Sequence, residues 1–348
     1  MKSALHYPSD SHLHNLSALV QHELQYPLRN LQGVIQKLSS GQLGQLSGED
    51  NQLLQTATLD LDRLIRLAKA VKTQPTALTA LLSPKQARLY QLRQDLPIAI
   101  KNQEINLVYQ PIICSKTETV YGFEALARWH HPTYGLICPT IFIPLTEEEG
   151  VIHQMGQQLT TIACHQLCQW QQAFPQPCPL TMSVNLSALQ LTQLVLAEHV
   201  EYVLATSQIA PNTLKLEITE SALVENDHVV AAVVQKLINL GVKFHLDDFG
   251  TGYSALSRLK SFPLNALKVD RSFVSKKEWD ICEIIYALGE KLNLNVIVEG
   301  IETHEDFEKL KGIGFRYMQG HYFSRPLTAD DAANFLSGFC LSVTPNHF

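Results

Sequence analysis

Residues 214–248, LKLEITESALVENDHVVAAVVQKLINLGVKFHLDD, show the alternation that decides the fold. The runs LKLEIT at 214–219 and KFHLDD at 243–248 are short and β-rich, and the stretch between them has a helical pattern. A strand, a helix and a second strand in this order form a parallel βαβ unit. The stretch therefore favours an α/β fold.

The same alternation extends on both sides of this stretch, from Gln86 onward. Eight β-rich runs with helices between most of them occupy about 250 residues, which predicts a (β/α)8 barrel of the TIM type. The runs are INLVYQPII (105–113), VYGFEALARW (120–129), TMSVNLS (181–187), LKLEIT, KFHLDD, ALKVD (266–270), NVIVEG (295–300) and YMQG (317–320). Only Cys114 to Thr119 separate the first two runs, too few for a crossover helix. We therefore expect a modified barrel with an antiparallel first strand.

Composition bounds the class of protein. The 348 residues are 45% apolar and 17% charged, which allows a large core and two or three domains. A net charge of −6 argues against duplex nucleic acid as a partner. The N-terminus lacks the pattern of a secretory signal, and no apolar stretch approaches bilayer length. Seven cysteines without a CxxC pair suit a reducing compartment, so we expect a cytoplasmic protein without membrane insertion.

Two amphipathic helical patterns precede the predicted barrel. Apolar residues recur at helical spacing over residues 16–38 and 53–71, on either side of the turn SGQLGQLSGED at 40–50. Two helices with one apolar stripe each cannot close a core, so we expect residues 1–74 to form an all-α hairpin that pairs into a homodimeric four-helix bundle. Residues 75–87 are then expected to be a linker, and residues 88–340 the barrel.

Polar residues lie at the end of nearly every predicted strand after the first. They are Glu124, Asn185, Glu217, Asp247, Asp248, Lys268, Glu299 and Gln319. In a barrel of this type the C-terminal ends of the strands line one mouth, so these side chains are expected to meet there. The five carboxylates among them would repel one another without cations, and oxygen ligands suit Mg²⁺ or Mn²⁺.

Two metal ions commonly support in-line attack on a phosphate. The ligands expected for the first ion are Glu124, Asn185, Glu217 and Asp247. Asp247 would bridge to the second ion, which Asp248 also binds. We expect Lys268 to hold or polarise the attacking hydroxide, and Glu299 to orient water or shuttle its proton.

Eight ordered motifs resemble those of EAL-domain phosphodiesterases over residues 88–330: YQPI, EALARW, NLS, EITES, DDFGTGYSAL, LKVDRSF, VEGIET and QG. The resemblance implies metal-dependent cleavage of cyclic di-GMP to linear pGpG, with the same metal ligands and with Glu124, Lys268 and Glu299 as catalytic residues. The substrate-binding residues that it implies are Gln110, Leu126, Arg128 and Gln319. It also implies that Arg128 grips a phosphate, and that Glu220, aided by Glu302, braces the DDFGTGYSAL loop.

The segment HELQYPL at residues 22–28 resembles the phosphoacceptor box of histidine kinase dimerisation domains, which implies that His22 is the phosphoacceptor. Pro27 within the helical pattern favours a kink at this point. Residues 73–87 cannot hold an ATP-binding domain, so phosphate would have to come from a histidine kinase or response regulator partner. Two interpretations stay open, namely a domain kept only for dimerisation and one that exchanges phosphate.

Two alternatives to the enzyme also stay open for the barrel. One is a catalytically silent receptor that binds cyclic di-GMP, and the other is a scaffold that docks a two-component signalling partner. The presence of every expected ligand and of Lys268 favours the enzyme.

Overall fold

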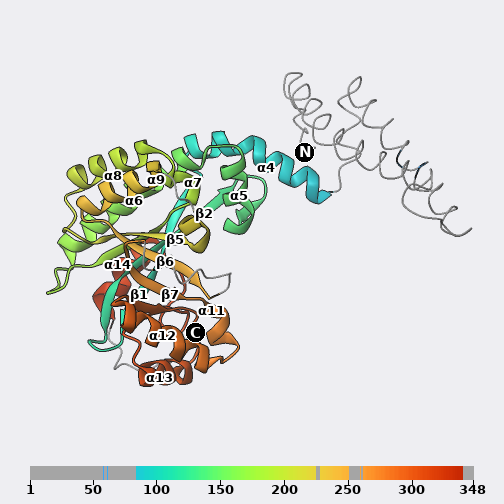
Figure 1. Cartoon of the computed structure of the whole chain (residues 1–348). Coiled ribbons are helices and arrows are strands. Elements are labelled where there is room, and N and C mark those ends of the chain that lie inside the picture. Colours follow the sequence, from blue (N-terminus) through green and yellow to red (C-terminus); the bar gives the residue numbers. More distant parts are fainter. Residues whose placement is uncertain are drawn as a thin grey trace, which may run out of the picture. The chain divides into compact units, whose positions relative to one another are not determined.

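The computed structural model describes residues 58, 61, 84–224, 228–250, 259 and 262–339. The chain divides into two compact units, Met1–Leu92 and Arg93–Phe348. The predicted helical hairpin lies outside the described residues except for Thr58 and Leu61, so the four-helix bundle and the role of His22 stay predictions. Helix α4 (Pro84–Lys101) begins inside the range for which we expected a linker (Figure 1).

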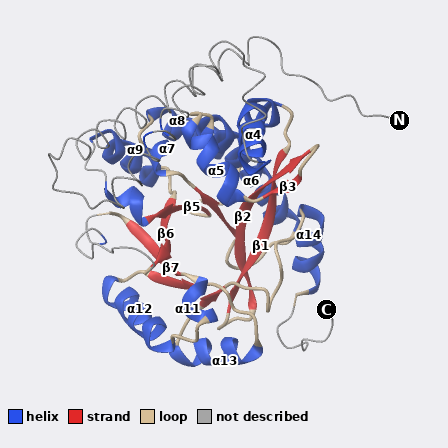
Figure 2. Cartoon of the chain, turned by 90° about the vertical axis from the view of Figure 1, so that its right-hand side faces the viewer, coloured by secondary structure: helices blue, strands red, loops and turns tan. Residues whose placement is uncertain are grey.

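The second unit is built on a single closed sheet. Within the described residues its strands are β1 (Ile105–Cys114), β2 (Thr119–His131), β3 (Gly135–Ile137), β4 (Thr181–Asn185), β5 (Leu214–Thr219), β6 (Lys243–Phe249), β7 (Leu264–Val269), β8 (Asn295–Val298) and β9 (Tyr317–Met318). The order is β1-β9-β8-β7-β6-β5-β4-β2-β3, and a further pairing of β1 with β2 closes the ring. Figure 2 shows this ring of strands with helices on its outside. The closed α/β barrel confirms the predicted fold class.

The first strand is antiparallel to both of its neighbours. Strand β1 pairs antiparallel with β2 and with β9, whereas the pairs from β4 to β9 are all parallel. The loop from Cys114 to Thr119 allows only a hairpin, as we predicted. The short strand β3 was not predicted. It pairs antiparallel with the end of β2 beyond the ring.

Helices join most of the parallel strands. They are α5 (Pro139–Glu148), α6 (Ile152–Ala173), α7 (Ala188–Leu191), α8 (Leu194–Ser207), the 3-10 helix η1 (Glu220–Val224), α9 (His228–Asn239), α11 (Arg271–Ser275), α12 (Trp279–Leu292), α13 (His304–Ile313) and α14 (Ala329–Gly338). None of the helices in these described ranges has the length and apolar character needed to cross a bilayer.

Local sequence fixes several helix ends. Thr303 and Asp306 form a capping box at the start of α13, because each side chain accepts a hydrogen bond from the other's backbone N–H. Gly314 ends the same helix at φ +118°, a left-handed conformation that glycine adopts without strain. A second capping box, of Ser187 and Gln190, starts α7 directly after β4. These caps fix the chain near the ends of the strands.

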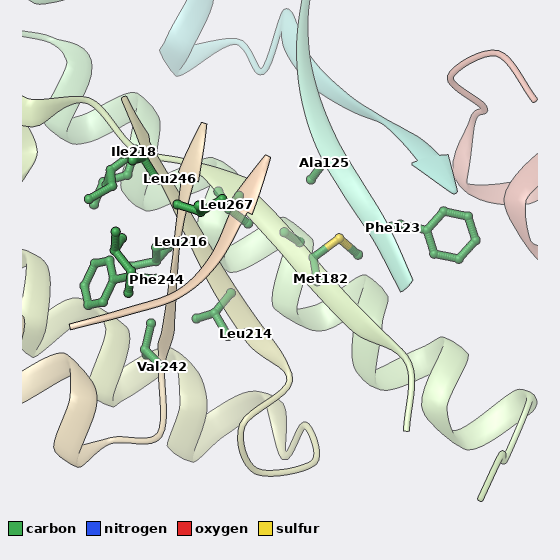
Figure 3. Close-up of a cluster of buried hydrophobic side chains, with 14 of the residues drawn as sticks. Phe123, Ala125, Met182, Leu214, Leu216, Ile218, Val242, Phe244, Leu246 and Leu267 are labelled. Carbon is green, nitrogen blue, oxygen red and sulfur yellow. The ribbon is translucent and has the colours of Figure 1, made fainter. Parts of the chain in front are cut away.

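The alternation of side chains along each strand separates two environments. On one face, apolar side chains such as Phe123, Leu216, Phe244 and Leu267 pack in the layer beneath the helices (Figure 3). On the other face, a smaller cluster lies inside the barrel, formed by Ile112, Cys114, Ala266, Ile297 and Tyr317. Residues that share the inner face but lie further toward the C-terminal ends of the parallel strands are polar.

Candidate active site

Seven of the eight polar residues predicted at the strand ends meet at one mouth of the barrel. They are Glu124, Asn185, Glu217, Asp247, Lys268, Glu299 and Gln319, connected to one another by hydrogen bonds and ion pairs. Strand register explains the gathering, because Asn185 is paired with Glu217 across β4 and β5. Parallel strands bring the residues at their C-terminal ends to the same edge.

Lys268 stands at the centre of this group. Its ammonium nitrogen Nζ lies 2.5 Å from Glu217 Oε2, 2.6 Å from Glu299 Oε1, 3.0 Å from Asp247 Oδ1 and 3.3 Å from Glu124 Oε2. The lysine side chain is 1% exposed, so these charges are largely removed from water. Four carboxylates around one buried cation leave a strong excess of negative charge.

Glu124 is held by two side-chain amides. Asn185 Nδ2 donates to Glu124 Oε1 at 2.9 Å, and Gln319 Nε2 donates to Glu124 Oε2 at 2.8 Å. Gln319 Nε2 also donates to Gln110 Oε1 at 3.1 Å, which ties β1 to the same network. Both oxygens of Glu124 are therefore oriented before any ligand arrives.

The carboxyl groups of the mouth have pKa values that are shifted in different directions. Burial would raise the pKa of Glu124, but Lys268 and the amides of Gln319 and Asn185 together hold that pKa below its ordinary value. Burial raises the pKa of Glu217 well above its ordinary value, and the charges of Glu124 and Asp247 add to this effect. Burial likewise raises the pKa of Glu299 to about 8, against the opposing effect of Lys268. Although burial opposes it, the surrounding carboxylates raise the pKa of Lys268 well above its ordinary value, so this lysine stays charged.

Asp248 is directed differently from Asp247. Its backbone has φ +52°, a left-handed conformation that turns the chain directly after Asp247. Burial and the charges of Asp247 and Asp270 raise the pKa of Asp248 to about 6. Asp248 thus lies close enough to Asp270, the N-cap residue of α11, for the two carboxyl groups to interact. Its expected place at a second metal ion stays a prediction.

The expected substrate-binding residues follow Glu124 along the hairpin. Leu126 and Arg128 share the face of Glu124 on β2, since side chains alternate along a strand. Gln110 is paired with Glu124 across β1 and β2, and its Nε2 donates to the carbonyl of Ser324 at 3.3 Å. Arg128 Nη1 donates to its neighbour's carbonyl, Ala127 O, at 2.8 Å. The geometry gives one continuous strip beside the carboxylates.

The loop after β6 is described only at its base. Gly250 N donates to Glu220 Oε1 at 3.2 Å, and the expected role of Glu220 in bracing the rest of the loop stays a prediction. Residues 251–258, including Gly252 and most of DDFGTGYSAL, lie outside the described residues. The side chain of Glu302 is exposed, and its expected support of the loop stays a prediction.

The residues at the mouth fit a divalent metal. One carboxylate oxygen from each of Glu124, Glu217 and Asp247 lies within 4.8 Å of the other two. Among the described residues, the buried oxygen Gln319 Oε1 has no hydrogen-bond partner. A buried oxygen without a donor and an excess of carboxyl groups are what a hard cation with oxygen ligands would satisfy.

The EAL domain family matches residues 93–326. The chain belongs to this family. The matched range includes every strand of the EAL barrel and all the residues at its mouth.

Relatives of this EAL domain occur in larger signalling proteins. The oxygen sensor protein DosP of Escherichia coli is 43% identical over 253 residues, which cover 71% of this chain and 31% of DosP. The cyclic di-GMP phosphodiesterase NbdA of Pseudomonas aeruginosa is 36% identical over 260 residues, covering 73% of this chain and 33% of NbdA. The chain thus spans about a third of the length of these curated relatives.

The EAL barrel is also similar to solved structures. The PaMucR phosphodiesterase in complex with c-di-GMP has a TM-score of 0.65 and 36% sequence identity, covering 70% of this chain and 99% of that chain. The EAL domain of Mycobacterium smegmatis DcpA has a TM-score of 0.57 and 28% identity, covering 69% of this chain and 98% of that chain.

Two polar residues of the EAL barrel were missed by the sequence reasoning. His245 lies on β6 two positions before Asp247, so period-two alternation places both on the inner face, a signal that could have found it. Burial, Lys215 and Lys268 hold the pKa of His245 well below its ordinary value, which keeps the ring neutral. Asp270 ends the predicted run ALKVD but was not considered beside Asp248.

A separate cavity lies at the other end of the EAL barrel. It has a volume of about 440 Å³, and its lining includes Ser115 after β1, Asn295 at the start of β8 and Tyr317 at the start of β9. These positions are at the N-terminal ends of the parallel strands, away from the carboxylates. The cavity is therefore not part of the candidate active site.

Proposed function

We propose that this chain hydrolyses cyclic di-GMP to linear pGpG in a reaction that requires Mg²⁺ or Mn²⁺. The observation that carries the proposal is the group of four carboxylates around Lys268 at the C-terminal mouth of the barrel. Carboxylates gathered in a barrel mouth without a matching number of cations are suited to hold divalent metal ions, and such ions can support attack on a phosphate ester.

Glu124, Glu217 and Asp247, whose carboxylate oxygens lie within 4.8 Å of one another, would hold one ion together with Asn185, which contacts Glu124. Asp247 with Asp248 would hold the other. Bound divalent ions would activate water and neutralise charge on the leaving oxygen.

The chain's own residues would then position the reactants. Arg128, on the same face of β2 as Glu124, offers a guanidinium that can hold a phosphate oxygen. Lys268 Nζ lies at the centre of the carboxylates and would orient the attacking oxygen. Glu299, whose Oε1 lies 2.6 Å from Lys268 Nζ at the mouth, would carry the proton between water and leaving group. The balance is one water consumed: a P–O bond forms, the P–O3′ bond breaks, and O3′ leaves as a hydroxyl.

The nature of the substrate is supported by the relatives. NbdA is named a cyclic di-GMP phosphodiesterase, and the similar PaMucR structure contains c-di-GMP. In this chain, Gln110, Leu126 and Gln319 lie beside Arg128 or Glu124 on β1, β2 and directly after β9, where they would line the nucleotide site.

Turnover of cyclic di-GMP by the purified chain tests the proposal. With Mn²⁺ or Mg²⁺ present, chromatography should show conversion to pGpG, and EDTA should stop it. Glu124→Ala should lower turnover at least about a hundredfold. The control is Lys236→Ala, which removes only an exposed ion pair with Glu201 and should leave turnover unchanged.

The silent receptor defines the opposite outcome. The wild-type chain could bind cyclic di-GMP without forming pGpG at any Mn²⁺ or Mg²⁺ concentration. This result would overturn the proposed phosphodiesterase activity and favour the receptor or the scaffold. Binding that Arg128→Ala abolishes would still assign the nucleotide to this barrel mouth.

We further propose that residues 1–74 form a dimerising helical hairpin of the histidine kinase type, with His22 available to a kinase or response regulator. The support is the amphipathic pattern and the HELQYPL segment. The purified chain should be a dimer by light scattering, and polar substitution of Leu24 and Leu61 together should weaken it. A wild-type monomer would overturn this proposal. Transfer of ³²P from a phosphorylated partner, lost in His22→Ala, tests phosphate exchange separately.

A further inference from the structure

His245 lies directly beside a predicted metal ligand. In the register of β5 and β6 it is paired with Glu217, and it shares the inner face of β6 with Asp247. The histidine is 3% exposed, and Glu217 is 1% exposed. An imidazole is thus packed beneath the carboxylates of the mouth, where an apolar side chain would have filled the same space.

Two buried polar atoms face each other at this point. Within the described part of the chain, neither His245 Nδ1 nor Glu217 Oε1 has a hydrogen-bond partner, and they lie 3.8 Å apart. The other oxygen of the same carboxylate, Glu217 Oε2, contacts Lys268 Nζ at 2.5 Å. Buried polar atoms almost always have a partner, and a separation of 3.8 Å is only slightly longer than a hydrogen bond. A small rotation of either side chain would pair the two atoms.

We propose that His245 is a positioning residue for Glu217: its Nδ1–H donates to Glu217 Oε1 and so keeps Oε2 directed at the metal ions. The inference rests on the proposed metal-dependent function. A carboxylate that binds a metal ion is ionised, and only the tautomer with hydrogen on Nδ1 then suits this place, because an unprotonated nitrogen would face the carboxylate with its lone pair. Donors behind a metal-binding side chain fix its orientation and raise the affinity for the metal.

Three substitutions separate the hydrogen bond from simple packing. The amide nitrogen of asparagine can occupy the place of Nδ1, so His245→Asn keeps a donor toward Glu217. The amide of glutamine lies near the place of Nε2, so His245→Gln keeps a polar side chain but moves the donor away. His245→Leu fills a similar volume with no donor at all.

The test measures the affinity of the full chain for Mn²⁺ by calorimetry, in the absence of nucleotide. His245→Leu and His245→Gln should bind Mn²⁺ about 10- to 100-fold more weakly than the wild type, and His245→Asn within about threefold of it. Circular dichroism and the unfolding midpoint in EDTA establish that each variant is folded. If His245→Leu does not fold, the comparison of His245→Asn with His245→Gln carries the test.

Each outcome decides a different claim. Equal Mn²⁺ affinities for the wild type, His245→Gln and His245→Leu would overturn the role of His245 while leaving the metal site intact. Equal losses in His245→Asn and His245→Leu would show a packing role and also overturn it. If the wild-type chain bound Mn²⁺ no better than the Glu217→Ala variant, which lacks a proposed ligand, the proposed metal-dependent function would instead be overturned.

Discussion

At the scale of single residues, Lys268 stabilises the buried carboxyl groups of the mouth when no metal ion is bound. Its ammonium is the cation common to Glu124, Glu217, Asp247 and Glu299, and removing one partner of a buried ion pair leaves the others uncompensated. In EDTA, Lys268→Met should lower the free energy of unfolding by about 3–5 kcal/mol, and Mn²⁺ should restore more stability to it than to the wild type. Denaturant unfolding with and without Mn²⁺ measures both effects.

The matched control is an exposed lysine. Lys236→Met removes a surface pair with Glu201 and should change stability by less than about 1 kcal/mol, with the same response to Mn²⁺ as the wild type. An unchanged stability of Lys268→Met in EDTA would contradict the account of the buried network.

Glu299 gives the metal-free chain a pH dependence. Its pKa is about 8 in the folded state against an ordinary value of 4.5, so the folded state binds the proton more tightly than the unfolded state. Stability must then fall as pH rises between these two values, because the folded state has to give up its proton or hold an unfavourable charge. Unfolding in EDTA from about pH 5 to about pH 9 should show this fall, and Glu299→Gln should reduce its slope. A slope equal to that of the wild type would assign the effect to other carboxyls.

The adjacent carboxylates Asp247 and Asp248 end the run KFHLDD, and both were predicted at the metal ions. Alternation along a strand already predicts that such neighbours face opposite sides, so that only Asp247 shares the inner face with His245. In the structure Lys268 Nζ lies 3.0 Å from Asp247 Oδ1, whereas Asp248 lies near Asp270, whose charge raises its pKa. The left-handed φ of Asp248 depends on the tertiary structure and could not be predicted from the sequence.

At the scale of the elements, the turn after β8 positions Glu299. Gly300 has φ +77°, and a Cβ at this position would lie 2.4 Å from the Cβ of Arg271 on α11. Gly300→Ala should therefore destabilise the chain by about 1–3 kcal/mol. It should also lower kcat while changing KM less, because Glu299 is displaced. Gly312→Ala, where a Cβ in α13 meets nothing within 4 Å, should be neutral or slightly stabilising. Equal unfolding midpoints for the two variants would contradict this.

Strand positions were predicted better than strand lengths. Short β-rich runs between helical stretches located the eight strands of the ring, and the short first loop gave the antiparallel hairpin. The three residues of β3 are too few to show a periodic pattern, and the strand forms only through its pairing with β2 in the folded chain. The run YMQG contains only two strand residues, since Gln319 and Gly320 leave the sheet to contact the mouth and Ile301.

At the scale of the whole molecule, the closed sheet makes the barrel independent. Every strand of the ring pairs on both sides, so the ring itself has no open edge. Helix α4 belongs to this unit from Arg93 onward, since Arg93 pairs with Glu148 and Glu149 of α5 and its C-cap, and Asp95 with His131 of β2. This unit therefore begins within α4, at Arg93, and not at the first strand.

Two shortened chains test this boundary. Residues 84–348 should fold, bind Mn²⁺ and keep kcat within about threefold of the full chain, because all contacts of the mouth are retained. Residues 102–348 lose α4 and with it the ion pairs to α5 and β2, so they should unfold at lower denaturant and lose activity with stability. Light scattering, calorimetry and turnover measured on the same samples make the comparison. A folded but inactive chain of residues 84–348 would mean that the N-terminal unit completes the site, whereas a monomer with full turnover would leave that unit the roles of dimerisation and control.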